Sequence, residues 1–247
     1  MERNDFKGFS DFFATAAEKN GLSSLIKGEH IEKFFLLTEH MLTVNEQFNL
    51  TAIREPERVI LLHYIDSVVC ASLFPLGASV IDVGCGAGFP SLPLAIVRPD
   101  LRITALDSTA KRVNYVADTA RLLGLSGITP LVGRAEEVAA SATYREGFDC
   151  ATARAVAALP VLSELCLPFV KVGGSFIAMK GRGGGEELLA SKNAIRILGG
   201  GKATLSDAPV LAPDGEEFAH TTVVIPKISS TDKKYPRAYG KIVKAPL

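Results

Sequence analysis

The chain has 247 residues, 47% of them apolar, so it can bury one sizeable core and still carry a small additional module. It contains 27 basic and 27 acidic residues, a balance that excludes a strong overall field attracting charged partners. No stretch reaches the roughly 18 consecutive apolar residues of a membrane helix, so we expect a soluble, cytoplasmic protein without a membrane partner.

The first part of the chain, up to about residue 75, has apolar residues at helical spacing. In the segment 30–42, for example, Ile31, Phe34 and Leu42 fall on one face of a helix. No alternating pattern typical of a strand is present in this part. We therefore predict a helical N-terminal extension over residues 1–75.

From residue 76 onward, short apolar runs alternate with amphipathic segments. The predicted strands are 79–83, 101–107, 128–132, 148–154, 174–180, a weak 202–210 and 221–226, and the predicted helices are 90–98, 110–124, 135–142, 159–170 and 186–199. Strands that alternate with helices pair in parallel through right-handed crossovers. The pattern predicts an α/β domain over residues 76–247, with a mostly parallel, seven-stranded, Rossmann-like sheet and helices on both faces.

A glycine-rich turn follows the first predicted strand and leads into a helix. Gly84, Gly86 and Gly88 let the backbone turn tightly and let a ligand approach it at the carboxyl end of the strand. A dinucleotide-binding fingerprint that starts at Gly84 would require a small residue at position 89, where this chain has Phe89. The Gly-Lys-Ser/Thr ending of a P-loop is also absent, which excludes that phosphate site.

An acidic residue, Asp107, ends the second predicted strand. A carboxylate at this place can accept hydrogen bonds from both hydroxyls of a ribose. A glycine turn and a ribose acid without a phosphate site fit a nucleoside that carries no phosphates. S-adenosylmethionine is such a molecule, and Asp82 would lie near its cationic methionine end. The alternative is a purely structural turn, with Asp107 as a surface cap.

The last 21 residues, 227–247, hold six basic residues against the single acidic Asp232. Tyr235 and Tyr239 are interleaved with them, and Pro236 and Pro246 should keep the strip extended. Basic residues with aromatic neighbours are typical of an RNA-binding surface. A solvated basic tail is the alternative. The predicted RNA-binding residues, including two that flank the glycine after the fifth strand, are Lys180, Arg182, Lys233, Lys234, Arg237 and Lys241.

Other chemistry-bearing residues give weaker signals. The four cysteines form no Cys-x-x-Cys pair, and burial is the expected role of both Cys150 and Cys166. The histidines at 30, 40 and 220 have no clustered ligand partners, so we expect no metal site. His63 and Asp66 lie three residues apart on a predicted helix, where they can face the pocket together or form a helix-stabilising pair.

A series of short motifs runs in fixed order from residue 45 to the last residue. They are NEQFNLTAI (45–53), HYIDS (63–67), IDVGCGAGFPSLPLAI (81–96), ALDSTAKR (105–112), GRAEE (133–137), ATARAVAAL (151–159), MKG (179–181) and VVIPKISSTDKKYPRAYGKIVKAPL (223–247). Together they resemble the bacterial RsmG (GidB) family of 16S rRNA (guanine-N7) methyltransferases. The first forty or so residues add little to the resemblance.

The resemblance implies a class I methyltransferase fold, S-adenosylmethionine as methyl donor, and methylation of one guanine in the decoding-region loop of 16S rRNA or of the small ribosomal subunit. It implies cofactor contacts at Gly84, Phe89, Asp107, Ser108, Thr109, Ala135, Glu136 and Arg154. Cys85 and Ser91 replace the serine and glycine expected in this family, and both are small enough to preserve the turn. Asp232 stands where a proline is usual, which bears on the local shape of the tail.

Guanine N7 already carries a lone pair, so methylation there needs positioning rather than a general base, and we expect no catalytic side chain. An Asn/Asp-Pro-Pro-aromatic segment typical of amino-group methylation is absent after the fourth strand, where the chain has ATARAVAALP. Two alternatives stay open: a small-molecule methyltransferase and a noncatalytic RNA-binding assembly factor. We expect a monomer.

Overall fold

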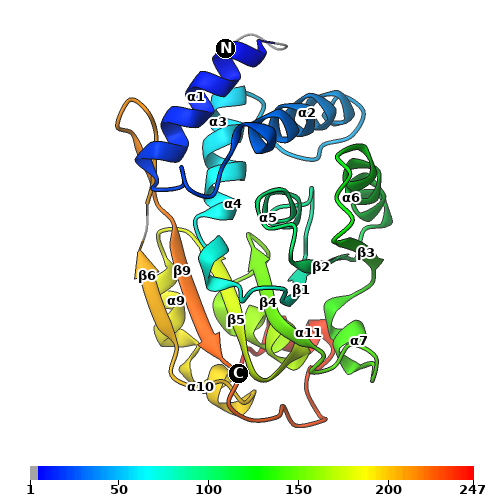
Figure 1. The fold of residues 1–247 in the computed structure, drawn as a ribbon. Helices are drawn as coiled ribbons and strands as arrows, with labels where there is room; N and C mark the ends of the chain where they lie inside the picture. The colour runs from blue at the N-terminus through cyan, green and yellow to red at the C-terminus, as the bar shows by residue number, and fades with distance from the viewer. Residues whose placement is uncertain (1–4, 208) are drawn as a thin grey trace.

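The computed structural model describes residues 5–207 and 209–247. Its centre is a sheet with the strand order β3-β2-β1-β4-β5-β9-β6 (Figure 1). The strands are β1 Ser79–Val83, β2 Arg102–Asp107, β3 Ile128–Val132, β4 Phe148–Arg154, β5 Val170–Lys180, β6 Thr204–Asp207 and β9 Thr221–Pro226. The first five strands are parallel, whereas β9 is antiparallel to both β5 and β6. The predicted mostly parallel, seven-stranded α/β sheet is confirmed.

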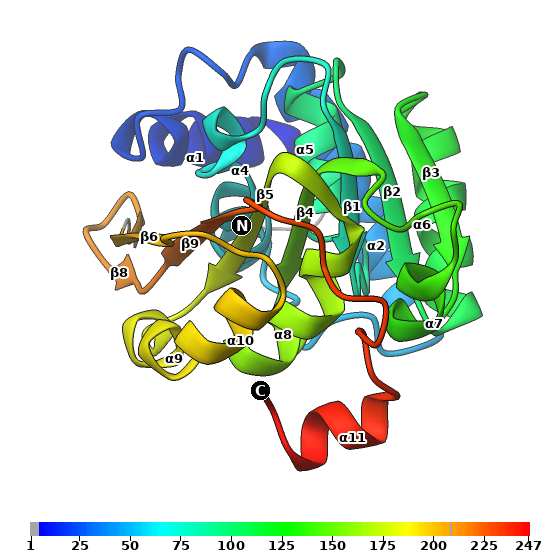
Figure 2. The ribbon, with the colours of Figure 1, turned by 90° about the horizontal axis from the view of Figure 1, so that it is seen from below.

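Helices cover both faces of this sheet (Figure 2). After β1 they are α5 Ser91–Val97, α6 Ala110–Leu122, α7 Ala135–Ala140, α8 Leu159–Cys166, the 3-10 turn η3 Leu167–Phe169, α9 Gly184–Ala190, α10 Lys192–Ile197 and α11 Tyr239–Lys244. Successive residues of β1 point to opposite faces, so Val80 packs in one apolar cluster and Ile81 and Val83 in the other. β1 is therefore covered on both sides, as its apolar sequence indicates.

The N-terminal part of the chain is helical, as expected. Its helices are α1 Phe6–Lys19, α2 Gly28–Asn45, α3 Pro56–Val59, the π-helix η1 Ile60–Ile65, α4 Asp66–Val68 and the 3-10 turn η2 Ala71–Leu73. They pack in the same apolar cluster as Val80. A buried hydrogen bond of 2.7 Å between Thr38 Oγ1 and Tyr64 OH joins α2 to η1. The division into two domains at residue 75 stays a prediction.

Three predicted elements differ from the structure in detail. The helix predicted over 186–199 is divided into α9 and α10 at Ser191, whose hydroxyl donates to the carbonyl of Glu187 and so competes with the backbone bonds of the helix. The helix predicted over 159–170 ends at Cys166, because Pro168 has no N–H to continue it. The weak strand at 202–210 becomes β6 and the start of β7 Val210–Leu211, which pairs with β8 Glu217–Phe218.

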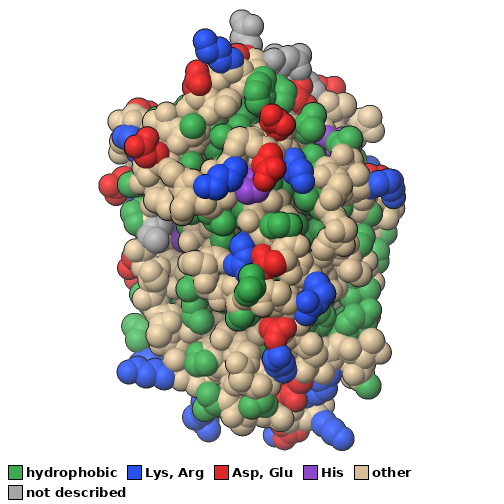
Figure 3. All heavy atoms as spheres, in the orientation of Figure 1, with side chains coloured by type: hydrophobic (Ala, Val, Ile, Leu, Met, Phe, Trp, Pro, Cys, Tyr) green, Lys and Arg blue, Asp and Glu red, His purple; other side chains and the backbone are tan. Residues whose placement is uncertain are grey.

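The expectation of an extended C-terminal strip is wrong for residues 239–244, which form α11. Ile242 on this helix is fully buried in the apolar cluster around α8, so the helix has an apolar contact that the local charge pattern does not show. On the face seen in Figure 3, basic and acidic side chains are interspersed over the surface. This mixture agrees with the balanced charge of the chain.

Candidate functional site

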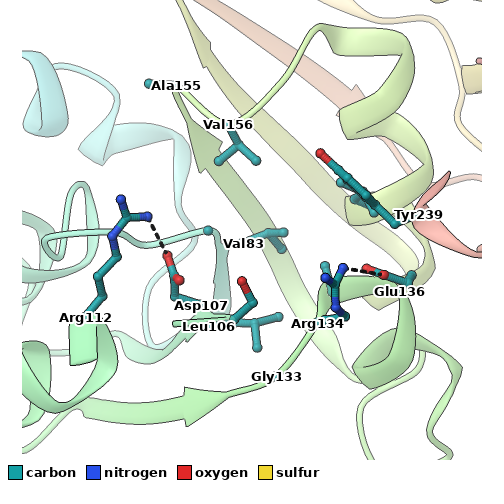
Figure 4. A pocket seen from close by; sticks show the side chains of 14 residues that line it. Val83, Leu106, Asp107, Arg112, Gly133, Arg134, Glu136, Ala155, Val156 and Tyr239 are labelled. Carbon is teal, nitrogen blue, oxygen red and sulfur yellow. Dashed lines mark hydrogen bonds and ion pairs between the residues drawn. The ribbon is translucent and has the colours of Figure 1, made fainter. Parts of the chain in front are cut away.

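A cavity of about 380 Å³ opens at the carboxyl ends of the parallel strands (Figure 4). This volume and this place are typical of small-molecule sites in open α/β sheets. The lining residues come from the ends of β1 and β2, from the turns after β1, β2, β3 and β4, and from α6, α7, α8 and α11. They are Val83, Gly84, Leu106, Asp107, Ser108, Arg112, Gly133, Arg134, Ala135, Glu136, Ala155, Val156, Leu165 and Tyr239.

The glycine turn after β1 has a backbone that only glycine adopts readily. Gly84 has φ of +78°, and a Cβ there would lie 2.6 Å from Cγ2 of Val156. Gly88 has φ of +87°, and its Cβ would lie 2.4 Å from Cδ1 of Leu92. Gly84 lines the cavity, while Gly88 lets α5 begin close to the turn. The predicted functional turn therefore lies at the site.

Asp107 lies at the middle of the site and is only 6% exposed. Its Oδ2 accepts a hydrogen bond from the backbone N–H of Gly86 at 3.1 Å, and its Oδ1 accepts one from the N–H of Thr109 at 2.8 Å. The guanidinium of Arg112 stands 3.7 Å from Oδ2. An ionised carboxylate has about four acceptor positions, so acceptor capacity remains for hydroxyl donors in the cavity. Gly86 and Thr109, predicted as ligand contacts, hold this carboxylate in place.

The opposite end of the cavity is formed by the turn after β3. Ala135 and Glu136, which the family resemblance implies, both line the cavity, and so does Ser108. Arg134 Nη1 stands 3.4 Å from Oε1 of Glu136. Tyr239 of α11 lies across from this pair in Figure 4. The sequence pattern places Tyr239 on an RNA surface and does not point to Arg134 or Gly133, which also line this end.

Arg154 does not line this cavity but a second one of about 420 Å³, which shares Ala155 with the first. Arg154 Nη1 donates to Oδ2 of Asp66 and to the carbonyl of Leu62, each at 2.7 Å. Asp66 Oδ1 in turn is bonded to Nδ1 of His220 at 2.7 Å. Burial would raise the pKa of Asp66, but the bonds and charges of His220 and Arg154 outweigh it and lower that pKa.

His63 supports Arg154 from the other side. Burial and the charge of Arg154 lower its pKa to about 3, so the ring is neutral. Arginine can only donate, so Nδ1 of His63 accepts from Arg154 at 3.2 Å and Nε2–H donates to Thr51 Oγ1 at 2.9 Å. Phe89, only 6% exposed, stacks on this ring at 4.4 Å and does not line the first cavity. His63 and Asp66 thus both bind Arg154; a cofactor contact by Phe89 or Arg154 stays a prediction.

The six predicted RNA-binding residues divide into two groups. Arg182, Lys233, Lys234 and Lys241 are exposed. Lys180 instead lines the second cavity, where its Nζ lies 2.8 Å from Glu187 Oε2 and donates to the carbonyl of Ala157 at 2.9 Å. Arg237 is paired with Glu164 at 2.6 Å. RNA binding by any of them stays a prediction, with the exposed group better placed for it.

Within residues 5–207 and 209–247, no cluster of three His, Cys, Asp or Glu residues can hold a metal ion. None of the helices described is long and apolar enough to span a bilayer. The cysteines are buried and free, and burial raises the pKa of Cys150 to about 11. A thiolate nucleophile is therefore disfavoured there.

Asp82 lies beneath the glycine turn, one residue before the cavity-lining Val83, and is fully buried. Its Oδ2 accepts a hydrogen bond from Ser91 Oγ at 2.6 Å, while its Oδ1 has no hydrogen-bond partner. Burial raises its pKa to about 7, against the opposing effect of the Ser91 bond. A buried carboxylate with an unfilled acceptor favours a cationic ligand group nearby.

Comparison with known proteins gives a consistent result. The family model described as rRNA small subunit methyltransferase G (GidB) matches residues 30–208. A protein named ribosomal RNA small subunit methyltransferase G from Clostridium beijerinckii is 44% identical over 241 residues, covering 97% of this chain and 99% of that protein. One of the same name from Lactobacillus delbrueckii subsp. bulgaricus is 42% identical over 240 residues, covering 96% and 98%.

Solved structures with little sequence similarity share the fold. An O-methyltransferase from Bacillus cereus in complex with SAH matches with a TM-score of 0.55 and 14% identity, covering 89% of this chain and 99% of that one. A SAM-dependent O-methyltransferase from Thermotoga maritima matches with a TM-score of 0.51 and 14% identity, covering 79% and 73%. At these identities the likeness concerns the fold alone.

Asp82 predicts an unusual pH dependence of stability in the ligand-free protein. Between about pH 4 and pH 7 the folded protein holds a proton that the unfolded chain has lost, so the contribution of this carboxyl to the free energy of unfolding falls as pH rises. Asp82→Asn removes this loss. Between pH 5 and pH 8, we expect the free energy of unfolding of the variant to rise by about 2–3 kcal/mol relative to that of wild type, at about 1.4 kcal/mol per pKa unit.

Urea unfolding at both pH values measures this difference. Asp118→Asn, which changes an exposed carboxylate on α6, is the control and should parallel wild type. If Asp82→Asn also parallels wild type at both pH values, the buried carboxyl does not titrate as described.

Proposed function

We infer the function from the fact that the chain belongs to the GidB family, the rRNA small subunit methyltransferases G. The family model covers most of the chain, and the relatives match it over nearly their whole length. The protein is an S-adenosylmethionine-dependent methyltransferase that acts on 16S rRNA. The finer assignment, to N7 of a guanine in the decoding-region loop, is our proposal. A monomeric state and a cytoplasmic location stay predictions.

The assignment of S-adenosylmethionine as cofactor rests on the position and contacts of Asp107. Its carboxylate lines the first cavity, is held by two backbone N–H groups, and retains acceptor positions for the ribose hydroxyls of S-adenosylmethionine. Asp82 would supply negative charge beneath the amino acid end, where its Oδ1 lacks a partner. When bound, the cofactor supplies an electrophilic methyl group. The residues of the first cavity therefore bind and orient, and none of them has to react.

The second cavity is the proposed place of the target guanine. It shares Ala155 with the cofactor cavity, and its lining carries both positive and negative side chains, including Arg154, Asp66 and Lys180. A guanine presents both hydrogen-bond donors and acceptors at its edges, which fits a lining of both signs. Closeness to the methyl donor is what this reaction requires of the site.

The side chains around the second cavity favour a methyl acceptor that does not have to lose a proton before it reacts. The Asp66 carboxylate is bonded to both Arg154 and His220, so it is committed to holding other side chains. His63 is neutral and both of its ring nitrogens are hydrogen-bonded. Neither residue is free to act as a general base. Guanine N7, with its available lone pair, is an acceptor of the required kind.

Exposed basic residues near the C-terminus are the proposed contacts to RNA phosphates. Lys233, Lys234 and Lys241 are solvent-exposed, and Arg182 is exposed in the loop after β5. Contacts of this type release counterions, so binding to RNA should weaken as salt concentration rises. Phosphate contacts position the substrate but carry no sequence information, so recognition of the guanine has to come from the second cavity and from RNA shape.

Loss of the Asp107 carboxylate should weaken cofactor binding. In Asp107→Asn one acceptor oxygen becomes an NH₂ group, which cannot accept the ribose hydroxyls or a backbone N–H. We expect the Kd for S-adenosylmethionine, measured by calorimetry, to rise at least about tenfold, equivalent to about 1.4 kcal/mol. Asp118→Asn, at an exposed position on α6, is the control and should bind like wild type. Wild-type binding by Asp107→Asn as well would remove the ribose assignment.

The target assignment is tested with small subunits and 16S rRNA from cells that lack this protein. Incubation with methyl-labelled S-adenosylmethionine should place label at N7 of one guanine in the decoding-region loop, located by chemical cleavage at 7-methylguanine. Asp107→Asn should incorporate label more slowly at equal cofactor concentration. Label at another atom or base would refute the N7 assignment, and transfer only to small acceptors would favour the small-molecule alternative.

A further inference from the structure

The wall of the cofactor cavity is completed by a residue close to the end of the chain. Tyr239, the first residue of α11, lines the cavity together with Glu136 and Leu165 (Figure 4). The residue is 42% exposed, so part of its surface is open to a ligand. The other lining residues belong to the sheet edge and to helices within residues 83–165. Tyr239 alone comes from the C-terminal segment.

The segment 227–247, here called the C-terminal strap, is held against the body of the protein by buried polar contacts. Lys227 is 1% exposed, and its Nζ donates to the carbonyl of Leu167 at 2.8 Å. Arg145 donates to three strap carbonyls, those of Thr231 at 2.8 Å, Asp232 at 3.1 Å and Tyr235 at 2.9 Å. The first half of the strap therefore has a defined path across the protein (Figure 2).

The second half of the strap is fixed beside the cavity itself. Arg237 donates from its backbone N–H at 2.8 Å and from Nη2 at 2.6 Å to Glu164, a residue of α8 that is fully buried. Leu165, the next residue of α8, lines the cavity. Ile242, on the other side of Tyr239, is buried in the core. Tyr239 is thus held between two attachments and cannot move far from the cavity while both persist.

The position of Tyr239 identifies which part of a ligand it can meet. Asp107, proposed to bind the ribose, lies in the middle of the cavity, and Tyr239 lies at the end formed by Arg134 and Glu136 (Figure 4). Asp82, buried one residue before the cavity-lining Val83, is proposed to lie beneath the amino acid end. The group left for the Tyr239 end is the purine, whose flat π-face suits stacking on an aromatic ring.

We propose that Tyr239 is a cofactor-binding residue that packs its ring against the adenine of S-adenosylmethionine, and that the C-terminal strap is a structural part of the cofactor site. This inference rests on the proposed function, because it takes S-adenosylmethionine as the ligand. It changes the role of the strap: the segment whose charges suggest RNA binding also completes the methyl donor pocket.

The test measures binding of S-adenosylhomocysteine and of 5′-methylthioadenosine, which lacks the amino acid end, by calorimetry on the full-length protein. Tyr239→Ala should weaken both ligands by a similar factor, about five- to fiftyfold, because the lost contact is to the purine. Tyr239→Phe, which keeps the ring, should bind within about twofold of wild type. Val243→Ala, an exposed apolar position on the same helix, is the matched control and should bind like wild type.

Thermal unfolding of each variant shows whether α11 stays folded, which is expected because Tyr239 is partly exposed. Equal binding by wild type and Tyr239→Ala would overturn the inference and leave the proposed function intact. Equal loss in Tyr239→Phe and Tyr239→Ala would also overturn it, since the hydroxyl and not the ring would be responsible. Failure of the wild-type protein to bind S-adenosylhomocysteine would refute the proposed function and this inference together.

Discussion

The Asp107 carboxylate joins two turns of the sheet edge, and the geometry of the cofactor cavity depends on it. One oxygen accepts the N–H of Gly86 in the turn after β1, and the other accepts the N–H of Thr109 at the start of α6. These turns are neighbours because β1 and β2 pair in parallel with Val83 opposite Leu106. A slip of one residue in this register would turn Asp107 to the other face of the sheet. Strand pairing thus determines both the shape of the glycine turn and the acceptor presented to the ligand.

The second cavity depends on a cation held by contacts from several elements. Arg154, at the end of β4, is bonded to Leu62 and His63 of η1 and to Asp66 of α4. Such a partly buried guanidinium is stable only when its donors are satisfied, so this network ties the N-terminal helices to the sheet edge. Ala155, the next residue and common to both cavities, has φ of +56°, which is uncommon for a residue with a Cβ.

Local patterns in the chain predict the sheet and the glycine turn, because strand periodicity and the need for positive φ are properties of neighbouring residues. They predict Asp107 for the same reason, since it ends its strand. They do not predict the pairing of Arg237 with Glu164 or the place of Tyr239 beside Leu165 in the cavity wall, because Glu164 and Leu165 are far from these residues in sequence. Charge alone places Lys180 among the predicted RNA contacts, although its ammonium group is paired with Glu187, seven residues later. The sequence shows which side chains carry charge, but not which of these charges form ion pairs in the folded protein.

The strap illustrates how such pairing changes the electrostatics of an RNA-binding protein. Two of its six basic residues are neutralised inside the fold, Lys227 beside Glu146 at 3.4 Å and Arg237 beside Glu164. Lys234 is further paired with the exposed Asp232 at 3.3 Å, a contact that solvent weakens. The positive charge available to RNA is therefore smaller than the composition suggests and is concentrated toward Lys233 and α11. Since each phosphate contact adds to the salt dependence of binding, a short surface of this kind favours a protein that recognises folded RNA mainly through shape, with few phosphate contacts.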